Sequence, residues 1–170
     1  RALVSVDDAA GVALAAVDEN REVRMATANG LATLGSGGVV VRRLVADDDP
    51  LVRAAALSAL GSIGCDDSDL PAIEKALAAP AWQIREAAAK ALSGATVEAA
   101  VQSLSSALTD PHLDVRKAAV LSLTRWAATE QIAQQLLGTA LDDSDADVRA
   151  YARRALAHSA GATVRRPHGC

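Results

Sequence analysis

Residues 110–123 read DPHLDVRKAAVLSL, and this stretch decides the fold because most of its pattern occurs five times in the chain. The pattern is D-P-x-x-x-V-R-x-A-A-x-x-x-L. Aligned on the Val/Ile–Arg pair, successive copies are separated by 29, 32, 31 and 33 residues. Self-similarity at such a period is the signature of a stacked repeat array. The five pairs are Val23-Arg24, Val52-Arg53, Ile84-Arg85, Val115-Arg116 and Val148-Arg149.

Within each copy the apolar residues recur with the period of a helix. We number positions from the Val/Ile as position 0. Positions 0, 3, 4, 7, 8 and 11 then lie on one helix face, which holds Val/Ile, small residues and leucine. This face is predicted to be buried. At position −5 four copies carry an aspartate that is predicted to accept hydrogen bonds from free N–H groups at the helix start: Asp18, Asp47, Asp110 and Asp143.

A shorter apolar segment precedes each of these helices, so each repeat is predicted to contain two helices. The expected first helices are 9–17, 38–46, 70–79, 97–109 and 130–141. One solenoid is expected over 9–159. Residues 1–8 are interpreted as the end of a preceding repeat or domain, and 160–170 as a C-terminal tail. The expected repeats are about 9–35, 36–64, 65–95, 96–127 and 128–159.

The repeated D-P-x-x-x-V-R-x-A-A motif in paired helices resembles the HEAT-repeat family, and its short period is similar to the HEAT-like repeats of the phycobilisome-lyase type. The resemblance covers nearly the whole chain. It implies an all-α fold, a right-handed α-solenoid of about five two-helix repeats. In such solenoids the second helices line a concave face that mostly binds proteins. The family does not determine a function, because many activities use this fold.

The composition argues against several classes of partner. The net charge is −4 and aromatic residues make up 2% of the chain, so a basic surface with stacking platforms for nucleic acid is not expected, although nucleic acid stays open as a partner. Cys65 and Cys170 match no metal-ligand spacing. No apolar run reaches the ~18 residues of a membrane span. We therefore expect a cytoplasmic protein with no metal, no cofactor and no membrane partner.

No arrangement of nucleophile, base and acid is visible, so the chain itself is predicted not to be an enzyme. Metal hydroxylases of the deoxyhypusine type within the HEAT-like group need paired His-Glu motifs. None of the three histidines, His112, His158 and His168, is followed by glutamate. HEAT-like DNA glycosylases would need a basic face with aromatic residues. A bilin lyase subunit stays open by motif, but nothing specifically favours it.

The arginines at position 1 are the most repeated polar feature: Arg24, Arg53, Arg85, Arg116 and Arg149. They are interpreted as partners of aspartates in the same or adjacent repeats, which would set the repeat register. The alternative is a basic ladder for an acidic ligand.

Positions 2, 5, 6 and 9 are predicted to be exposed on the second helices. They hold apolar residues in several repeats and cations towards the C-terminal end, so the predicted partner is an acidic or amphipathic protein segment. Scattered surface aliphatics, or a helix phase wrong by one position, would explain the pattern equally well. The predicted partner-binding residues are Met25, Leu57, Lys90, Lys117, Val120, Leu121, Arg153 and Arg154.

Two functions follow. The first is a non-catalytic protein–protein interaction scaffold that binds its partner on the second-helix face. The alternative is the C-terminal substrate-recognition domain of a larger multidomain enzyme, with RNA as a candidate substrate held by Arg125 and the cations above. Trp82, in the turn before a second helix, is a candidate interface anchor.

Overall fold

The computed structural model describes residues 9–163, and every regular element within them is a helix. The first helices of the repeats are short, and two of them end in a 3₁₀ turn. They are α1 (Ala9–Leu14) with η1 (Ala15–Val17), α3 (Gly38–Leu44), α5 (Leu70–Leu77), α7 (Val97–Ala107), and α9 (Gln131–Thr139) with η4 (Ala140–Asp142). The second helices are α2 (Arg21–Leu34), α4 (Pro50–Ile63), α6 (Trp82–Ala91) with η2 (Leu92–Gly94), α8 (Leu113–Leu123) with η3 (Thr124–Trp126), and α10 (Ala146–Thr163).

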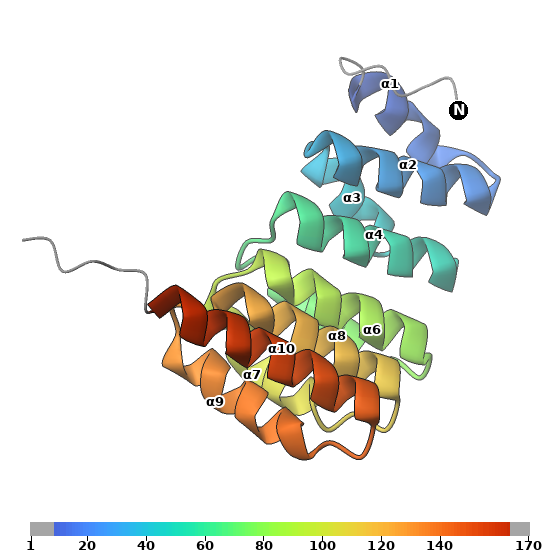
Figure 1. Cartoon of the computed structure of the whole chain (residues 1–170). Coiled ribbons are helices and arrows are strands. Elements are labelled where there is room, and N and C mark those ends of the chain that lie inside the picture. Colours follow the sequence, from blue (N-terminus) through green and yellow to red (C-terminus); the bar gives the residue numbers. More distant parts are fainter. Residues whose placement is uncertain (1–8, 164–170) are drawn as a thin grey trace, which may run out of the picture.

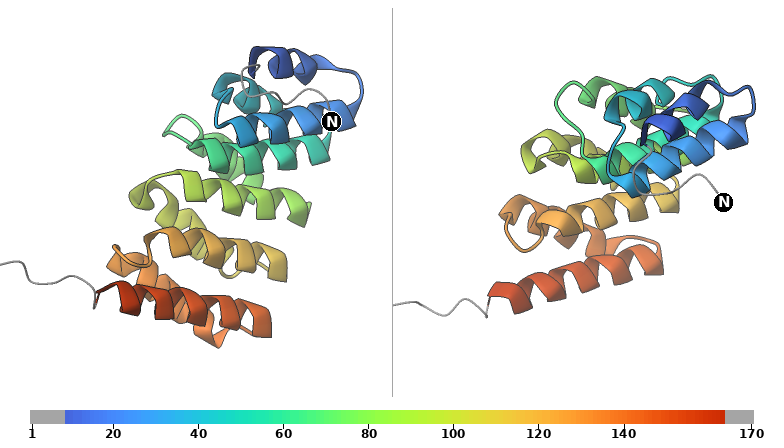
Figure 2. Two further views of the ribbon diagram at one scale, coloured as in Figure 1. Left: turned by 45° about the horizontal axis from the view of Figure 1, so that its top comes forward. Right: turned by 90° about the horizontal axis from the view of Figure 1, so that it is seen from above.

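The helices form two layers. The second helices lie side by side in chain order, and the first helices pack behind them (Figures 1 and 2). The predicted all-α solenoid of helical repeats is therefore confirmed. Helix α10 continues beyond residue 159 to Thr163. The predicted end of a preceding repeat, residues 1–8, and the tail from residue 164 onward lie outside the described residues.

The turns before the second helices are built in two steps. The aspartate at position −5 accepts the N–H of the residue at position −3, as between Asp47 and Asp49 at 2.9 Å. The residue at −3 then caps the helix, as Asp49 Oδ1 does by accepting the Leu51 N–H at 2.8 Å. The prediction that the first aspartate caps the helix directly is thus wrong, because that residue shapes the turn and its successor forms the cap.

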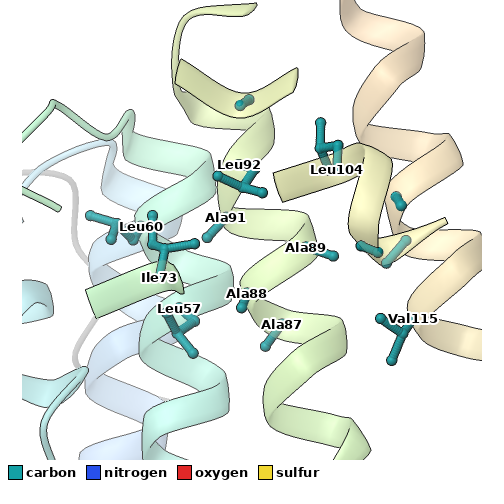
Figure 3. Close-up of a cluster of buried hydrophobic side chains, with 14 of the residues drawn as sticks. Leu57, Leu60, Ile73, Ala87, Ala88, Ala89, Ala91, Leu92, Leu104 and Val115 are labelled. Carbon is teal, nitrogen blue, oxygen red and sulfur yellow. The ribbon is translucent and has the colours of Figure 1, made fainter. Parts of the chain in front are cut away.

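One continuous hydrophobic core runs through the stack. At position 8, Leu31, Leu60, Leu92 and Leu123 are at most 1% exposed, and alanines fill much of the space between neighbouring second helices. Figure 3 shows Leu57 and Leu60 of α4 beside Ile73, with Ala87 and Ala88 on the adjacent α6. Small side chains at these positions let consecutive second helices approach closely.

Position 5 belongs to this core and not to the surface. Ala28, Leu57, Ala89 and Val120 occupy it in four repeats, and each is at most 1% exposed. The predicted exposure of Leu57 and Val120 is therefore wrong. A helix wheel with one buried face does not account for a helix that also packs a flank against the next repeat.

Two neighbouring second helices, α4 and α6, approach each other closely at Gly61. A Cβ atom at this glycine would lie 2.8 Å from the carbonyl oxygen of Lys90 and 2.9 Å from the Cα of Ala91. Both neighbours are backbone atoms of α6, so neither can move without moving the helix. Glycine at this point is a condition of the α4–α6 contact.

We expect Gly61→Ala to destabilise the protein by about 1–3 kcal/mol, because the added methyl group forces α4 and α6 apart. Gly138→Ala is the matched control. No atom lies within 4 Å of a Cβ at Gly138. Its helix should therefore gain roughly 0.5–1 kcal/mol. Urea unfolding followed by circular dichroism measures both. Equal effects of the two substitutions would contradict the close-packing argument.

Candidate protein-binding face and groove

The arginines at position 1 connect each repeat to the next. Arg24 donates from Nε and Nη2 to the carboxylate of Asp47 at 2.8 and 2.9 Å. The same geometry joins Arg85 to Asp110 and Arg116 to Asp143, at 2.7 and 3.0 Å in each pair. In all three arginines Nη1 also donates to carbonyl oxygens of its own turn.

These ion pairs are largely shielded from solvent: their arginine side chains are 12–15% exposed and their aspartates 8–11%. Hydrogen bonds from Arg24 and Arg116 lower the pKa of Asp47 and Asp143. At Asp110 burial raises the pKa, but the hydrogen bond from Arg85 helps to outweigh this effect, and the pKa is lowered there too. The predicted pairing with adjacent repeats is confirmed at these three junctions, so these arginines are not a free ladder for an acidic ligand.

The junction between the second and third repeats is built differently. Ala79 holds position −5 in the third repeat, and among the described residues no carboxylate pairs with Arg53. Its Nη1 keeps the bonds to the carbonyl oxygens of Asp47 and Asp48. Arg42 of α3 instead connects the two repeats, with Nε 2.7 Å from Asp69 and Nη2 2.9 Å from Asp66.

The remaining predicted partner-binding residues lie in different surroundings. Lys90, Leu121 and Arg154, all at position 6, are exposed on the second-helix face. Met25 and Lys117, at position 2, are half-buried. The residues at position 6 therefore form an exposed ridge on this face, whereas those at position 2 are partly covered by neighbouring residues.

Arg153 is exposed but lies on a different surface. It occupies position 5 of α10, the position whose residues in the preceding repeats are buried against the next second helix. Its side chain therefore belongs to the end flank of the described solenoid. A polar residue on that flank is typical of a terminal repeat.

Acidic side chains on the same face neutralise two of the predicted cations. Lys90 pairs with Glu86 one turn earlier. Lys117 Nζ lies 3.9 Å from an oxygen of Asp147 and 5.5 Å from the centre of the Tyr151 ring. By contrast, within residues 11–159 no carboxylate pairs with Arg125, Arg153 or Arg154.

A groove of about 330 Å³ lies between α8 and α10 on the second-helix face. It unites two predicted residues, Leu121 and Arg154, with seven that sequence reasoning did not assign to a site: Thr124, Ala127, Ala128, Tyr151, Ala155, His158 and Ser159. Contacts between helices of different repeats do not follow from periodicity within one helix. One signal was available, because Tyr151 is the single bulky residue at position 3, where the other four repeats have alanine.

Trp82 is not a free anchor. Its ring stacks on His112 of the following repeat, with centroids 3.9 Å apart and an angle of 6° between the planes. His112 in turn caps α8 by accepting the Asp114 N–H at Nδ1. The pair therefore joins the third and fourth repeats.

Among the described residues, no group of three or more His, Cys, Asp or Glu side chains is arranged to hold a metal ion. No described helix combines the length and apolar character needed to cross a membrane.

The repeat architecture matches a known family model, the HEAT repeats, over residues 9–93 and 70–157. The chain belongs to the HEAT repeat family. Proteins of this family commonly act as protein-interaction scaffolds. The sequence-based assignment to HEAT-like repeats is thereby confirmed. No curated protein matched the chain.

Solved structures similar to this HEAT-repeat chain include natural and designed proteins. The complex of CpcE and CpcF of phycocyanin lyase from Nostoc sp. PCC7120 matches with 22% identity and a TM-score of 0.68, covering 89% of this chain and 99% of that one. An engineered protein matches with 23% identity and a TM-score of 0.64, covering 91% and 80%. A designed armadillo repeat protein in complex with the peptide (KR)4 has 17% identity and a TM-score of 0.61, covering 86% and 79%. At these identities the matches establish the fold alone.

Ala79→Asp should restore the missing inter-repeat ion pair with Arg53. We expect a gain of about 1 kcal/mol in the free energy of unfolding, since the pair would resemble the partly buried pairs at the other junctions. Urea unfolding measures the gain. Ala79→Asn is the control, because it can shape the turn but cannot pair with Arg53. An equal gain in both variants would show that the turn, and not the ion pair, is responsible.

Asp143→Asn should lower stability by about 1–3 kcal/mol at neutral pH, because Arg116 loses its charged partner while the amide oxygen can still accept the Asp145 N–H. The folded pKa of Asp143 is lowered. The ion pair therefore stabilises the fold above the unfolded pKa of ~3.9, and its contribution disappears as pH falls through the folded pKa. Urea unfolding of both proteins at about pH 7 and about pH 2.5 should show this difference shrinking in acid. A constant difference would indicate a distorted turn instead.

Proposed function

We propose that this chain is a non-catalytic scaffold that binds a protein partner on the face formed by its second helices. The single observation that supports this most strongly is the exposed ridge at position 6. Lys90, Leu121 and Arg154 line up there on α6, α8 and α10, while the core positions around them are buried. Three adjacent repeats thus present an apolar residue between two cations.

The character of this ridge favours an acidic or amphipathic partner segment. The designed armadillo protein of similar fold holds the basic peptide (KR)4. On the present chain Arg154, at position 6 of α10, has no carboxylate partner within residues 11–159, so a peptide of the opposite charge is the better complement at this end of the ridge. Leu121, with 42% of its surface exposed, offers an apolar contact between them.

A second candidate is a substrate-recognition domain of a larger enzyme, with RNA as its ligand. The observation in its favour is that Arg125, Arg153 and Arg154 have no carboxylate partner within residues 11–159. Asp114 and Asp147 near the helix starts would repel phosphates on the same face. Phosphate contacts would make binding weaken steeply with salt, which distinguishes this function from the first.

The test is affinity capture from a lysate of the source cells with the wild-type chain and with Lys90→Glu/Leu121→Glu. We expect the double variant to capture at least ten-fold less of a partner protein than the wild type does. The variant reverses one charge of the ridge and places a carboxylate in its apolar centre. Both residues are exposed, so circular dichroism should be unchanged.

Val39→Glu/Arg43→Glu is the matched control, because it makes the same two kinds of change on exposed residues of α3 in the other layer. Equal capture by all three proteins would show that the second-helix face is not the binding surface. Loss of RNA instead of protein, with steep salt dependence, would favour the second candidate.

A further inference from the structure

We propose that the groove between α8 and α10 is the anchor site for an acidic partner segment. It receives one apolar side chain of that segment, and Arg154 binds a neighbouring carboxylate. This inference rests on the proposed function and narrows it to one place on the face and one kind of ligand.

The interior of the groove is apolar. Leu121 and Ala127 contribute from the α8 side, and Tyr151 and Ala155 from α10. The volume of about 330 Å³ lies at the lower end of the ~300–1,000 Å³ typical of ligand pockets, which suits one large side chain with its adjacent backbone. The exposed fraction of Leu121, 42%, is surface that such a side chain would bury.

Tyr151 forms a fixed wall of this groove. At position 3 the other repeats carry alanine, as at Ala118 in α8. The Tyr151 ring is held by Lys117, whose Nζ lies 5.5 Å from the ring centre and which also pairs with Asp147. Lys117 is therefore engaged within the protein, and the free cation of the groove is a different residue.

That cation is Arg154. Its side chain lines the groove and is exposed, and no carboxylate within residues 11–159 pairs with it. His158, one turn later, also lines the groove, and its Nδ1 hydrogen-bonds the carbonyl oxygen of Arg154 at 2.7 Å. A guanidinium beside an apolar groove is complementary to a carboxylate that follows or precedes an apolar residue.

The charges around the groove also favour one orientation of the partner segment along the axes of α8 and α10. Asp114 and Asp147 lie near the N-terminal ends of α8 and α10, where helix dipoles favour acidic residues. Arg154 and His158 lie towards the C-terminal half of α10. A partner carboxylate is therefore expected on the side of Arg154 and is repelled on the side of the aspartates.

The experiment is selection of random 12-residue peptides displayed on phage against the 170-residue chain. We expect enriched sequences to carry Asp or Glu beside a large apolar residue. An enriched peptide, synthesised with a fluorescein label, should bind at least ten-fold more weakly to Arg154→Glu in fluorescence anisotropy. Ala128→Trp, which fills the groove from an exposed position without changing charge, should weaken binding similarly.

Charge reversal in the peptide provides the specific control. The same peptide with its acidic residue changed to lysine should bind Arg154→Glu more tightly than it binds the wild-type chain. Val39→Glu/Arg43→Glu should bind the original peptide as the wild type does. These two results separate a direct contact with Arg154 from a loss of fold.

Basic consensus sequences, absence of enrichment, or equal affinity for Arg154→Glu, Ala128→Trp and wild type would each overturn the groove as the anchor site. Peptides that bind both groove variants as tightly as the wild type, but lose affinity for Lys90→Glu, would place binding elsewhere on the face. That outcome overturns this inference and leaves the proposed function standing. Capture of RNA by Arg154 with steep salt dependence would overturn both.

Discussion

The structure depends on the close approach of consecutive second helices. Alanine at position 4 of four repeats and glycine at Gly61 let the backbones of adjacent helices come within contact distance, and no aromatic residue lies at these positions. The inner second helices α4, α6 and α8 are therefore buried on three sides, against their first helices and against both neighbours. What remains for solvent is one narrow ridge, and any ligand of this face must be recognised by the residues on that ridge.

The ion pairs between repeats follow from the same geometry. Because the second helices are parallel and close, the arginine at the start of one helix reaches the turn before the next, where an aspartate accepts both of its N–H groups. Where that aspartate is missing, at Ala79, a pair from the first-helix layer takes its place through Arg42. The acidic residues near position −5 are thus mostly engaged inside the protein, and the net charge of −4 says little about the ridge.

Much of the fold could be predicted from the sequence, because the repeat period, the leucine at position 8 and the arginine–aspartate pairs are all visible in one chain. The exposure of position 5 was predicted wrongly, since a helical wheel marks one buried face and does not include the flank against the next repeat. Ala28, Leu57, Ala89 and Val120 were apolar at that position, and the change to Arg153 in the last repeat was the signal that this flank is internal. The groove could not be predicted for a different reason. It is formed by side chains of two repeats, and the pattern of a single helix does not show how two repeats pack against each other.

The placement of the groove has a physical cause in the last repeat. In the other four repeats position 3 is alanine, whose side chain is too small to form the wall of such a groove. At the α8–α10 junction Tyr151 replaces the small residue, and its ring occupies space beside Leu121 without filling all of it. Lys117 lies near the ring and pairs with Asp147, which leaves Arg154 as the cation facing the groove. Tyr151 therefore provides the wall of the groove, and the engagement of Lys117 within the protein leaves its positive charge to Arg154.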